Sequence, residues 1–315
     1  MASSANEADR KLIVCAGMSV IDHVYRVAAF PVAGTKTRAK DFFSVLGGCA
    51  ANAAIAVSRL GGCTRVVSPL GGPAGRDLTG DNVLAKLRQE NVDVAHVVRT
   101  DGAVSSRSSI FIDDDGDRTI VSYRDPRIEA ARPQNPAEAV AGADAVLADN
   151  RFPEFVLPIV RAALANRKLV VLDGDKPMGL GDELLALPNH IVFSADGLRA
   201  TAQTDDLAMA LKTVSERTVA VVAVTQGSQD MLWLEGGVLQ RLPAFRIDAV
   251  DTLGAGDVFH GAFALALAEG RDVVASMRFA AAAAAVKCTR MGGGNAAPGL
   301  DEVEEFLLSH PEGRA

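Results

Sequence analysis

Residues 250–263, with the sequence VDTLGAGDVFHGAF, contain the residue types most suited to chemistry in this chain. Three small residues at 254–256 separate Asp251 from Asp257, and a smooth apolar run follows them. The pattern predicts a turn that leads directly into a buried helix. Such a turn presents bare backbone N–H groups at the positive end of a helix dipole, where an anion such as phosphate can bind.

Asp257 is predicted to lie in the first turn of that helix, beside the anion. A carboxylate there is badly placed to bind phosphate but well placed to take a proton from a group that attacks phosphate. A structural reading competes with this one, because glycine-rich turns often precede helices and aspartate is a good helix cap. Taken alone, the pattern favours the structural reading, and it is no Walker loop because no Gly-Lys-Ser/Thr follows.

The composition excludes several classes of protein. The chain has 315 residues, 49% of them apolar, a net charge of −7 and a pI near 5.3. The negative charge argues against nucleic acid or an anionic membrane as the main partner. The four cysteines have no CxxC spacing, so free thiols in a reducing cytoplasm are expected rather than zinc or disulfides. Residues 1–10 have no apolar core and are predicted to be a disordered lead-in, not a signal peptide.

Most of the chain alternates short Val/Ile/Leu runs with helical patterns, most strictly after residue 130. This alternation is typical of a parallel sheet with helices on both faces, a doubly wound α/β fold. The predicted strands are 12–16, 65–70, 145–149, 169–173, 190–193 and 219–225, with a hairpin at 231–234 and 238–242. The predicted helices are 53–60, 76–90, 153–166, 182–187, 205–216, 257–269, 272–290 and 301–308.

Two segments, at about 20–45 and 103–124, mix polar and β-branched residues and do not fit the main sheet. They are predicted to form a small β-sheet lid at one edge, with the acidic run 113–117 as a hairpin tip. Ligands of doubly wound sheets bind at the carboxyl ends of the strands. The polar residues expected to meet in one crevice there are Asp22, Asp149, Asp173, Thr225 and Asp257.

Two motifs resemble those of one family. GGCAAN at 47–52 is similar to the N-terminal signature of the ribokinase-like, or PfkB, carbohydrate kinases. DTLGAGD at 251–257, followed by Phe259 and Gly261, is similar to their C-terminal signature. The resemblance covers about residues 12–309. It implies a single ribokinase-like domain over residues 11–315 and an ATP-dependent sugar kinase that phosphorylates a primary hydroxyl.

The resemblance also implies residue roles. Asp257 matches the catalytic base, and Gly254, Ala255 and Gly256 match the anion hole for the transferred phosphoryl group. Mg²⁺ is expected with ATP, although the stretch FSADGLR at 193–199 lacks the Asn-x-x-Glu motif that places it in many members. The remaining matches are Asp22, Gly48 and Asn52 with the sugar, and Thr225 and Gly227 with the loop beside the nucleotide. Lys287, Gly292 and the strip to Ala296 match the segment flanking adenine, and with Asp251 that strip supplies carbonyls to a monovalent cation such as K⁺ in many members.

Within the family, the chain is similar to the sulfofructose kinases through LDGD (172–175), FSADGL (193–198), VTQGS (224–228) and KCTR (287–290). That similarity implies transfer to the C1 hydroxyl of 6-deoxy-6-sulfofructose. Lys36 and Arg151 match the sulfonate ligands, and Ser122 replaces an asparagine. The two cations would equally suit the phosphate of fructose 6-phosphate or tagatose 6-phosphate. Without the resemblance, Lys36 reads as a solvated residue and Arg151 as part of a structural ion pair.

Other substrates and a different class of protein stay open. Fructose, ribose and 2-keto-3-deoxygluconate are alternative substrates. A sugar-binding protein that kept the fold but lost catalysis is the rival class, although the intact DTLGAGD argues against it. His260, one turn after Asp257, is expected to be hydrogen-bonded rather than to carry protons. A homodimer through the lid is expected.

Overall fold

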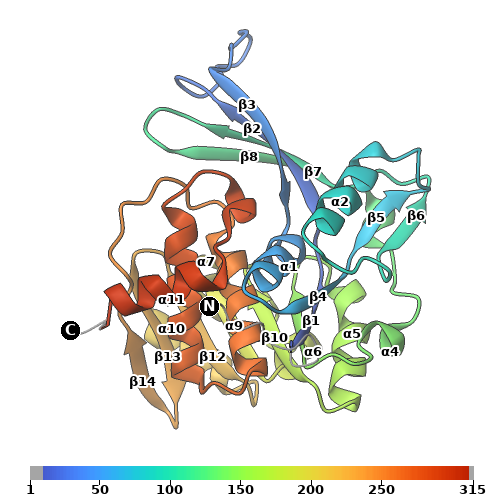
Figure 1. The fold of residues 1–315 in the computed structure, drawn as a ribbon. Coiled ribbons are helices and arrows are strands. Elements are labelled where there is room, and N and C mark those ends of the chain that lie inside the picture. The colour runs from blue at the N-terminus through green and yellow to red at the C-terminus, as the bar shows by residue number, and fades with distance from the viewer. Residues whose placement is uncertain (1–9, 312–315) are drawn as a thin grey trace.

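The computed structural model describes residues 10–311, so the lead-in predicted for residues 1–10 falls almost entirely outside the described residues. An eight-stranded sheet forms the centre (Figure 1). All its neighbouring strands pair in parallel, as the alternating pattern predicts, except at one edge, where a hairpin pairs antiparallel both within itself and with the strand beside it. Its order is β14 (Val238–Leu242), β13 (Gln229–Glu235), β12 (Val221–Gln226), β11 (His190–Ser194), β10 (Leu169–Gly174), β9 (Ala145–Asp149), β1 (Leu12–Ala16) and β4 (Cys63–Val67).

Helices cover both faces of this sheet and bury a separate apolar core on each. One face is covered by α1 (Cys49–Arg59), α9 (Ala255–Ala268) and α10 (Val273–Cys288), with α11 (Leu300–Ser309) against α10. The other face is covered by α5 (Pro153–Ala165), α7 (Ala195–Ala202) and α8 (Leu207–Ser215). Helices α1 and α9 approach closely where both carry small residues. A Cβ at Gly261 of α9 would lie only 2.5 Å from the carbonyl oxygen of Ala53 in α1.

A second, four-stranded sheet projects away from the body in Figure 1. We call it the small sheet. Its order is β3 (Asp41–Gly47), β2 (Val20–Arg26), β7 (Arg107–Ile112) and β8 (Arg118–Tyr123). These strands come from the two segments expected outside the main sheet, and residues 113–117 connect β7 to β8 as expected. The predicted strand 36–45 begins five residues later, because residues 27–40 form a long loop.

The structure differs from the sequence prediction in several places. The predicted strand 65–70 divides at Ser68, and its second part, β5 (Pro69–Gly72), leaves the main sheet to pair with β6 (Val98–Asp101). Helix α7 was not expected. It begins where the Ser194 hydroxyl accepts a hydrogen bond from the amide of Gly197. The remaining elements are α2 (Leu78–Gln89), α3 (Pro126–Glu129), α4 (Pro136–Ala139), α6 (Glu183–Ala186) and a 3₁₀ turn, η2 (Gly293–Ala296).

None of the helices within residues 10–311 has the length and apolar character needed to cross a bilayer. All four cysteines are free, as their spacing predicts.

Candidate active site

The turn before α9 requires a glycine. Gly254 has a φ of +75°, and a Cβ there would lie 2.6 Å from the amide nitrogen of Gly294. Helix α9 begins at Ala255, two residues before the predicted start, so Asp257 lies in its first turn as expected. The amide of Val258 donates to the carbonyl of Gly254, but the amides of residues 256 and 257 find no hydrogen-bond acceptor in the described part of the chain. These free N–H groups at a helix N-terminus can bind an anion.

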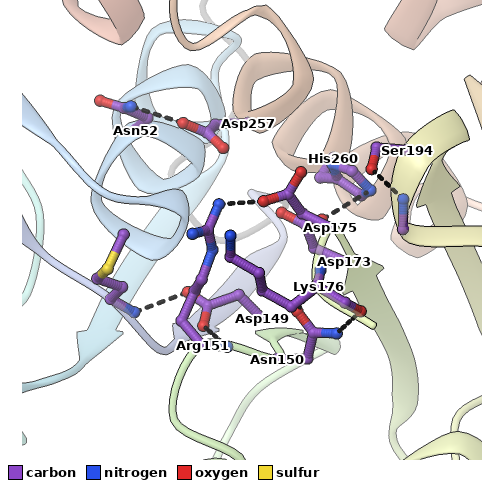
Figure 2. Close-up of polar contacts among 12 residues, drawn as sticks. Asn52, Asp149, Asn150, Arg151, Asp173, Asp175, Lys176, Ser194, Asp257 and His260 are labelled. Atoms are coloured by element: carbon purple, nitrogen blue, oxygen red, sulfur yellow. Dashed lines mark hydrogen bonds and ion pairs between the residues drawn. The ribbon is translucent and has the colours of Figure 1, made fainter. Parts of the chain in front are cut away.

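The two signature motifs meet at Asp257. The side-chain amide of Asn52, in the first turn of α1, donates to the Asp257 carboxylate at 2.6 Å (Figure 2). Asn52 is buried, and its own carbonyl oxygen finds no donor among the described residues. Gly48, at a φ of +95°, is the last residue before α1. The sequence prediction that residues 47–52 and 251–257 form one site is therefore supported by this contact.

Asp22 reaches the same site from the small sheet. Burial raises the pKa of Asp22 to about 6, a hydrogen bond with Ser108 opposes the rise, and the negative charge of Asp257 adds to it. The carboxylate lies so close to Gly47 that a Cβ at that position would overlap it. The N-terminal motif thus leaves room for Asp22 beside Asn52.

Further acidic side chains lie at the ends of β9 and β10. Burial raises the pKa of Asp149 to about 7, although the carboxylate accepts hydrogen bonds from two backbone amides, those of Met18 and Arg151. Burial likewise raises the pKa of Asp173 to about 6, while the positive charge of His260 opposes the rise. Asp149 and Asp173 therefore lie buried side by side at the carboxyl ends of two neighbouring parallel strands.

Cys49 is a crevice residue that the sequence prediction missed. Its thiol and one carboxylate oxygen each of Asp173 and Asp257 lie within 4.8 Å of one another. Burial, reinforced by the nearby carboxylates, raises the pKa of Cys49 well above its usual value. The thiol stays neutral and is a poor metal ligand, since the thiolate is the form that binds metals. The available signal was spacing, because Cys49 and Asn52 are three residues apart on one helix.

His260 is buried one turn along α9 from Asp257. Its Nδ1 lies 2.7 Å from the carbonyl oxygen of Gly256, and its Nε2 lies 3.1 Å from that of Val192. The carboxylate of Asp173 is 3.7 Å from Nε2. Burial alone would lower the pKa of His260, but Asp173 and the two carbonyls together raise it above the usual value. This confirms that the side chain is hydrogen-bonded.

Asp251 anchors the loop in front of α9. Its carboxylate accepts hydrogen bonds from the amides of Leu253, Gly292 and Gly293, at 2.9 to 3.1 Å. The fully buried ammonium group of Lys287 lies 3.4 Å from the same carboxylate and donates to the Asp251 carbonyl at 2.6 Å. Burial by itself would raise the pKa of Asp251, but these donors together hold it below its usual value.

This arrangement limits what the side chains of Asp251 and Lys287 can bind. A carboxylate has about four lone-pair positions, and three amides and one ammonium group occupy those of Asp251. The carboxylate of Asp251 therefore has no position left for a further cation, and its backbone carbonyl already accepts a hydrogen bond from Lys287. Lys287 itself is 0% exposed, so its side chain stabilises the loop and is not available to a nucleotide.

The other residues matched to the nucleotide lie around the far strands and η2. Thr225 is the next-to-last residue of β12, and its hydroxyl donates to the Phe193 carbonyl at 3.3 Å. Gly227, with a φ of +63°, forms the turn into β13, and Gly292, with a φ of +129°, precedes η2. Both glycines have backbone conformations that other residues rarely adopt.

The stretch 193–199 contributes no evident magnesium ligand. The Ser194 hydroxyl is used as the cap of α7, and the side chain of Asp196 is 98% exposed beside Arg199. The side chains of this segment therefore fit a Mg²⁺ ion that is held mainly by phosphate and water.

Arg151, expected to bind an anion, follows β9 and forms an ion pair with Asp175 after β10 (Figure 2). Its side chain is mostly buried, and its Nε has no acceptor in the described structure. Asn150 ties the two strand ends together by bonding both backbone polar groups of Lys176. Sequence reasoning did not single out Lys176, which adds a second cation to this edge of the crevice.

The other two residues of the expected anion pocket lie apart from each other. The Ser122 hydroxyl is 3.2 Å from that of Ser108 on the neighbouring strand, and Ser108 in turn pairs with Asp22 in the small sheet. Ser122 therefore shares the face that points toward the crevice. Lys36 is exposed and forms no ion pair within residues 10–311; it belongs to the loop 27–40. That loop joins β2 to β3 at the end of the small sheet away from the body (Figure 1). The structure does not bring Lys36 to Arg151.

Known proteins share this architecture and sequence. The model of the pfkB family carbohydrate kinases matches residues 10–299. Ribokinase from Bacillus subtilis is 29% identical over 282 residues, covering 88% of this chain and 92% of the relative. Fructokinase-1 from Zea mays is 29% identical and covers 95% and 98%. A crystal structure of an Agrobacterium tumefaciens protein assigned as a ribokinase has a TM-score of 0.88 at 33% identity, covering 95% and 98%.

The fold and the site thus define a carbohydrate kinase. The chain belongs to the pfkB family of carbohydrate kinases. This confirms the predicted ribokinase-like α/β fold and the predicted class of enzyme.

Proposed function

We propose that the enzyme transfers the γ-phosphate of ATP to a primary hydroxyl of a ketose-type sugar, with 6-deoxy-6-sulfofructose to its 1-phosphate as the best candidate reaction. The contact of Asn52 with the carboxylate of Asp257, a residue whose own amide is one of the two free amides of α9, is the observation that most supports phosphoryl transfer. Use of ATP is supported by a fructokinase from Xylella fastidiosa, 26% identical with a TM-score of 0.78, whose structure contains bound ATP.

In the proposed reaction, Asp257 takes the proton of the sugar hydroxyl as its oxygen attacks the γ-phosphorus. The bond from that phosphorus to the bridging oxygen of ADP breaks, and ADP leaves with the electron pair. The free amides of Gly256 and Asp257 would stabilise the negative charge on the transferring phosphoryl group, whereas the amide of Ala255, expected in the anion hole, donates to the Thr252 carbonyl. Asn52 orients Asp257 through its hydrogen bond. Mg²⁺ bound to ATP would neutralise part of the phosphate charge.

Asp22, Gly48 and Asn52 are the proposed ligands of the sugar hydroxyls. Burial holds the pKa of Asp22 near 6, so near neutral pH its carboxylate can accept hydrogen bonds from a diol. The small sheet would act as a lid on a single kinase domain, and the hydrogen bond from Arg118 of β8 to Thr252 already joins it to the loop before α9. A closed lid excludes water, which otherwise competes with the sugar for the phosphoryl group.

The choice of a sulfonated sugar depends on the anion pocket. Arg151 is paired with Asp175 after β10, Ser122 lies on the same face of the small sheet as Asp22, and Asn150 ties Lys176 to the strand end next to Arg151. Lys36 is distant, so its role requires that the lid or a second copy of the chain bring it closer. Fructose 6-phosphate and tagatose 6-phosphate would suit the same cations, whereas ribose, fructose and 2-keto-3-deoxygluconate would leave the sulfonate position empty.

A coupled assay of ADP release tests the function. The panel contains sulfofructose, fructose 6-phosphate, fructose and ribose, each with Mg²⁺ and ATP. We expect sulfofructose to give the highest kcat/KM. A higher value for ribose or fructose would reject the anionic substrate but keep the kinase. Sugar binding without ADP release from any sugar would contradict the kinase reaction and favour a binding protein.

We also infer a homodimer through the small sheet. Phe42, Val121 and Tyr123 are exposed by 52 to 61%. The strand register places all three on the face opposite Asp22, where Phe42 packs against Tyr25. An exposed apolar face of this kind suits a second copy of the sheet. Light scattering after size exclusion should give twice the chain mass, and Val121→Lys should give the monomer mass. A monomeric wild-type protein would contradict the dimer.

A further inference from the structure

Both ring nitrogens of His260 face atoms that can only accept hydrogen bonds. Nδ1 points at the carbonyl of Gly256 and Nε2 at the carbonyl of Val192, with the Asp173 carboxylate also near Nε2. A neutral imidazole has one bare nitrogen, which would place its lone pair against a carbonyl lone pair in a site that is only 4% exposed. The ring that satisfies every partner carries two protons and a positive charge.

The charges around the ring agree with this state. Asp173 of β10 and Asp257 of α9 are the charged groups that face His260. Helix α1 contributes the neutral thiol of Cys49 beside Asp173 and Asp257, and β11 contributes only a backbone carbonyl to the ring. The nearest ring, that of Phe259, meets the imidazole edge to face. No described cation lies close enough to oppose a second proton on His260.

We propose that His260, as a doubly protonated imidazolium paired with Asp173, is a positioning residue that strengthens the anion hole and fixes the first turn of α9. The inference rests on the proposed phosphoryl transfer, but the protonation state can be measured without turnover. His260 touches neither substrate nor phosphate. It acts through the peptide group between Gly256 and Asp257.

The coupling to the anion hole is direct. The imidazolium donates to the Gly256 carbonyl, whose peptide group continues into the free amide of Asp257. A charged donor on a carbonyl polarises that peptide group, so its N–H becomes a better donor to an anion. The bond from Nε2 to Val192 of β11 ties the same turn to the main sheet. The positive charge also offsets Asp173, which lies within 4.8 Å of Asp257 in the crevice.

Histidine ¹⁵N NMR on the full chain tests the protonation state. At about pH 7.5, about one unit above the ordinary histidine pKa, His260 should show two protonated nitrogens, a signal that His260→Gln removes. His190 is the internal control, because burial lowers its pKa to about 4 and its Nδ1 finds no partner in the described structure. A bare nitrogen on His260 at this pH would overturn the proposal, whatever the enzyme phosphorylates.

The kinetic test separates positioning from mere packing. His260→Gln keeps one donor but loses the charge, so kcat should fall about tenfold, less than for loss of a direct anion-hole donor, with KM for the sugar little changed. The wild-type kcat should fall as pH rises through the His260 pKa, and this alkaline limb should be missing in His260→Gln. Equal alkaline limbs in both proteins, or an unchanged kcat in a folded variant, would contradict the proposal. Absence of turnover in the wild type would reject the kinase function instead.

Discussion

Two buried ion pairs flank the turn that begins α9, and they are satisfied in opposite ways. In the pair of Asp251 and Lys287, the carboxylate has a complete set of donors from three amides and one ammonium group. In the pair of Asp173 and His260, the cation has its acceptors, whereas Asp173 accepts no hydrogen bond from residues 10–311 and only faces the ring at 3.7 Å.

The difference separates a structural anchor from a functional charge. A buried charge with all its hydrogen bonds made holds its surroundings in one arrangement, here the loop before Gly254 and the turn at η2. A buried carboxylate left without a hydrogen-bond donor is costly to fold and therefore suggests a role at the site. Changes at Asp251 or Lys287 should mainly affect stability, and changes at Asp173 or His260 should mainly affect rate.

The largest expected stability effect is at the anchor. Lys287→Met removes the ammonium group and leaves Asp251 buried without its counter-charge, which costs about 3–5 kcal/mol. Urea unfolding measures the loss. The matched control is Lys40→Met, because the ion pair of Lys40 with Asp114 is exposed on both sides and should contribute about 0–1 kcal/mol. Similar losses in the two variants would contradict the anchor role.

A third ion pair, that of Arg151 with Asp175, is predicted to exchange partners when substrate binds. Arg151→Ala should lower kcat/KM about 10- to 100-fold for an anionic sugar, the range expected for a charged hydrogen bond, and much less for a neutral sugar. Lys36→Ala should show the same selectivity if closure of the small sheet brings Lys36 to the anionic group of the sugar. Steady-state kinetics with sulfofructose and fructose measures both. Equal losses for the two sugars would show that Arg151 only supports the fold.

The pKa of Asp149 is raised, whereas the donors around Asp251 lower its pKa. The two carboxylates should therefore make the stability of the protein depend on pH in opposite directions. Burial raises the pKa of Asp149 to about 7, so between about pH 4 and pH 7 the folded chain binds a proton that the unfolded chain has lost. Stability therefore falls as pH rises through this window. Thermal melts should show a Tm lower by a few degrees at about pH 8 than at about pH 5, a trend that Asp149→Asn reduces. A flat profile in the wild type would exclude this linkage.

The smallest expected effect is that of K⁺. Because Lys287 already supplies a positive charge to Asp251, exchange of tetramethylammonium for K⁺ should leave the wild-type Tm within about 1 °C, as for a salt that does not bind the folded state. A selective stabilisation by K⁺ would show that a cation site exists despite the occupied carboxylate. The turnover rate measured in the same two salts gives an independent check.

The sequence predicted the parts of the site that local pattern determines. The contact of Asn52 with Asp257 could be anticipated because each residue belongs to a motif with a fixed place relative to a helix start. The burial of Lys287 could not, since its partner is 36 residues away and helix periodicity does not reveal which neighbour covers a face. The strand break at Ser68 depends on pairing with β6, a long-range contact that the residues 65–70 do not encode.

The central claim is that Asp257 is the general base of a sugar kinase, and Asp257→Asn tests it most directly. The variant keeps the size of the side chain but cannot accept the proton of the sugar hydroxyl. With the best substrate of the panel, kcat should fall about 10²- to 10⁴-fold, the usual contribution of a general base, while the sugar affinity from calorimetry changes little. A folded variant that retains more than about a tenth of the wild-type kcat, below the usual contribution of a base, would contradict the account.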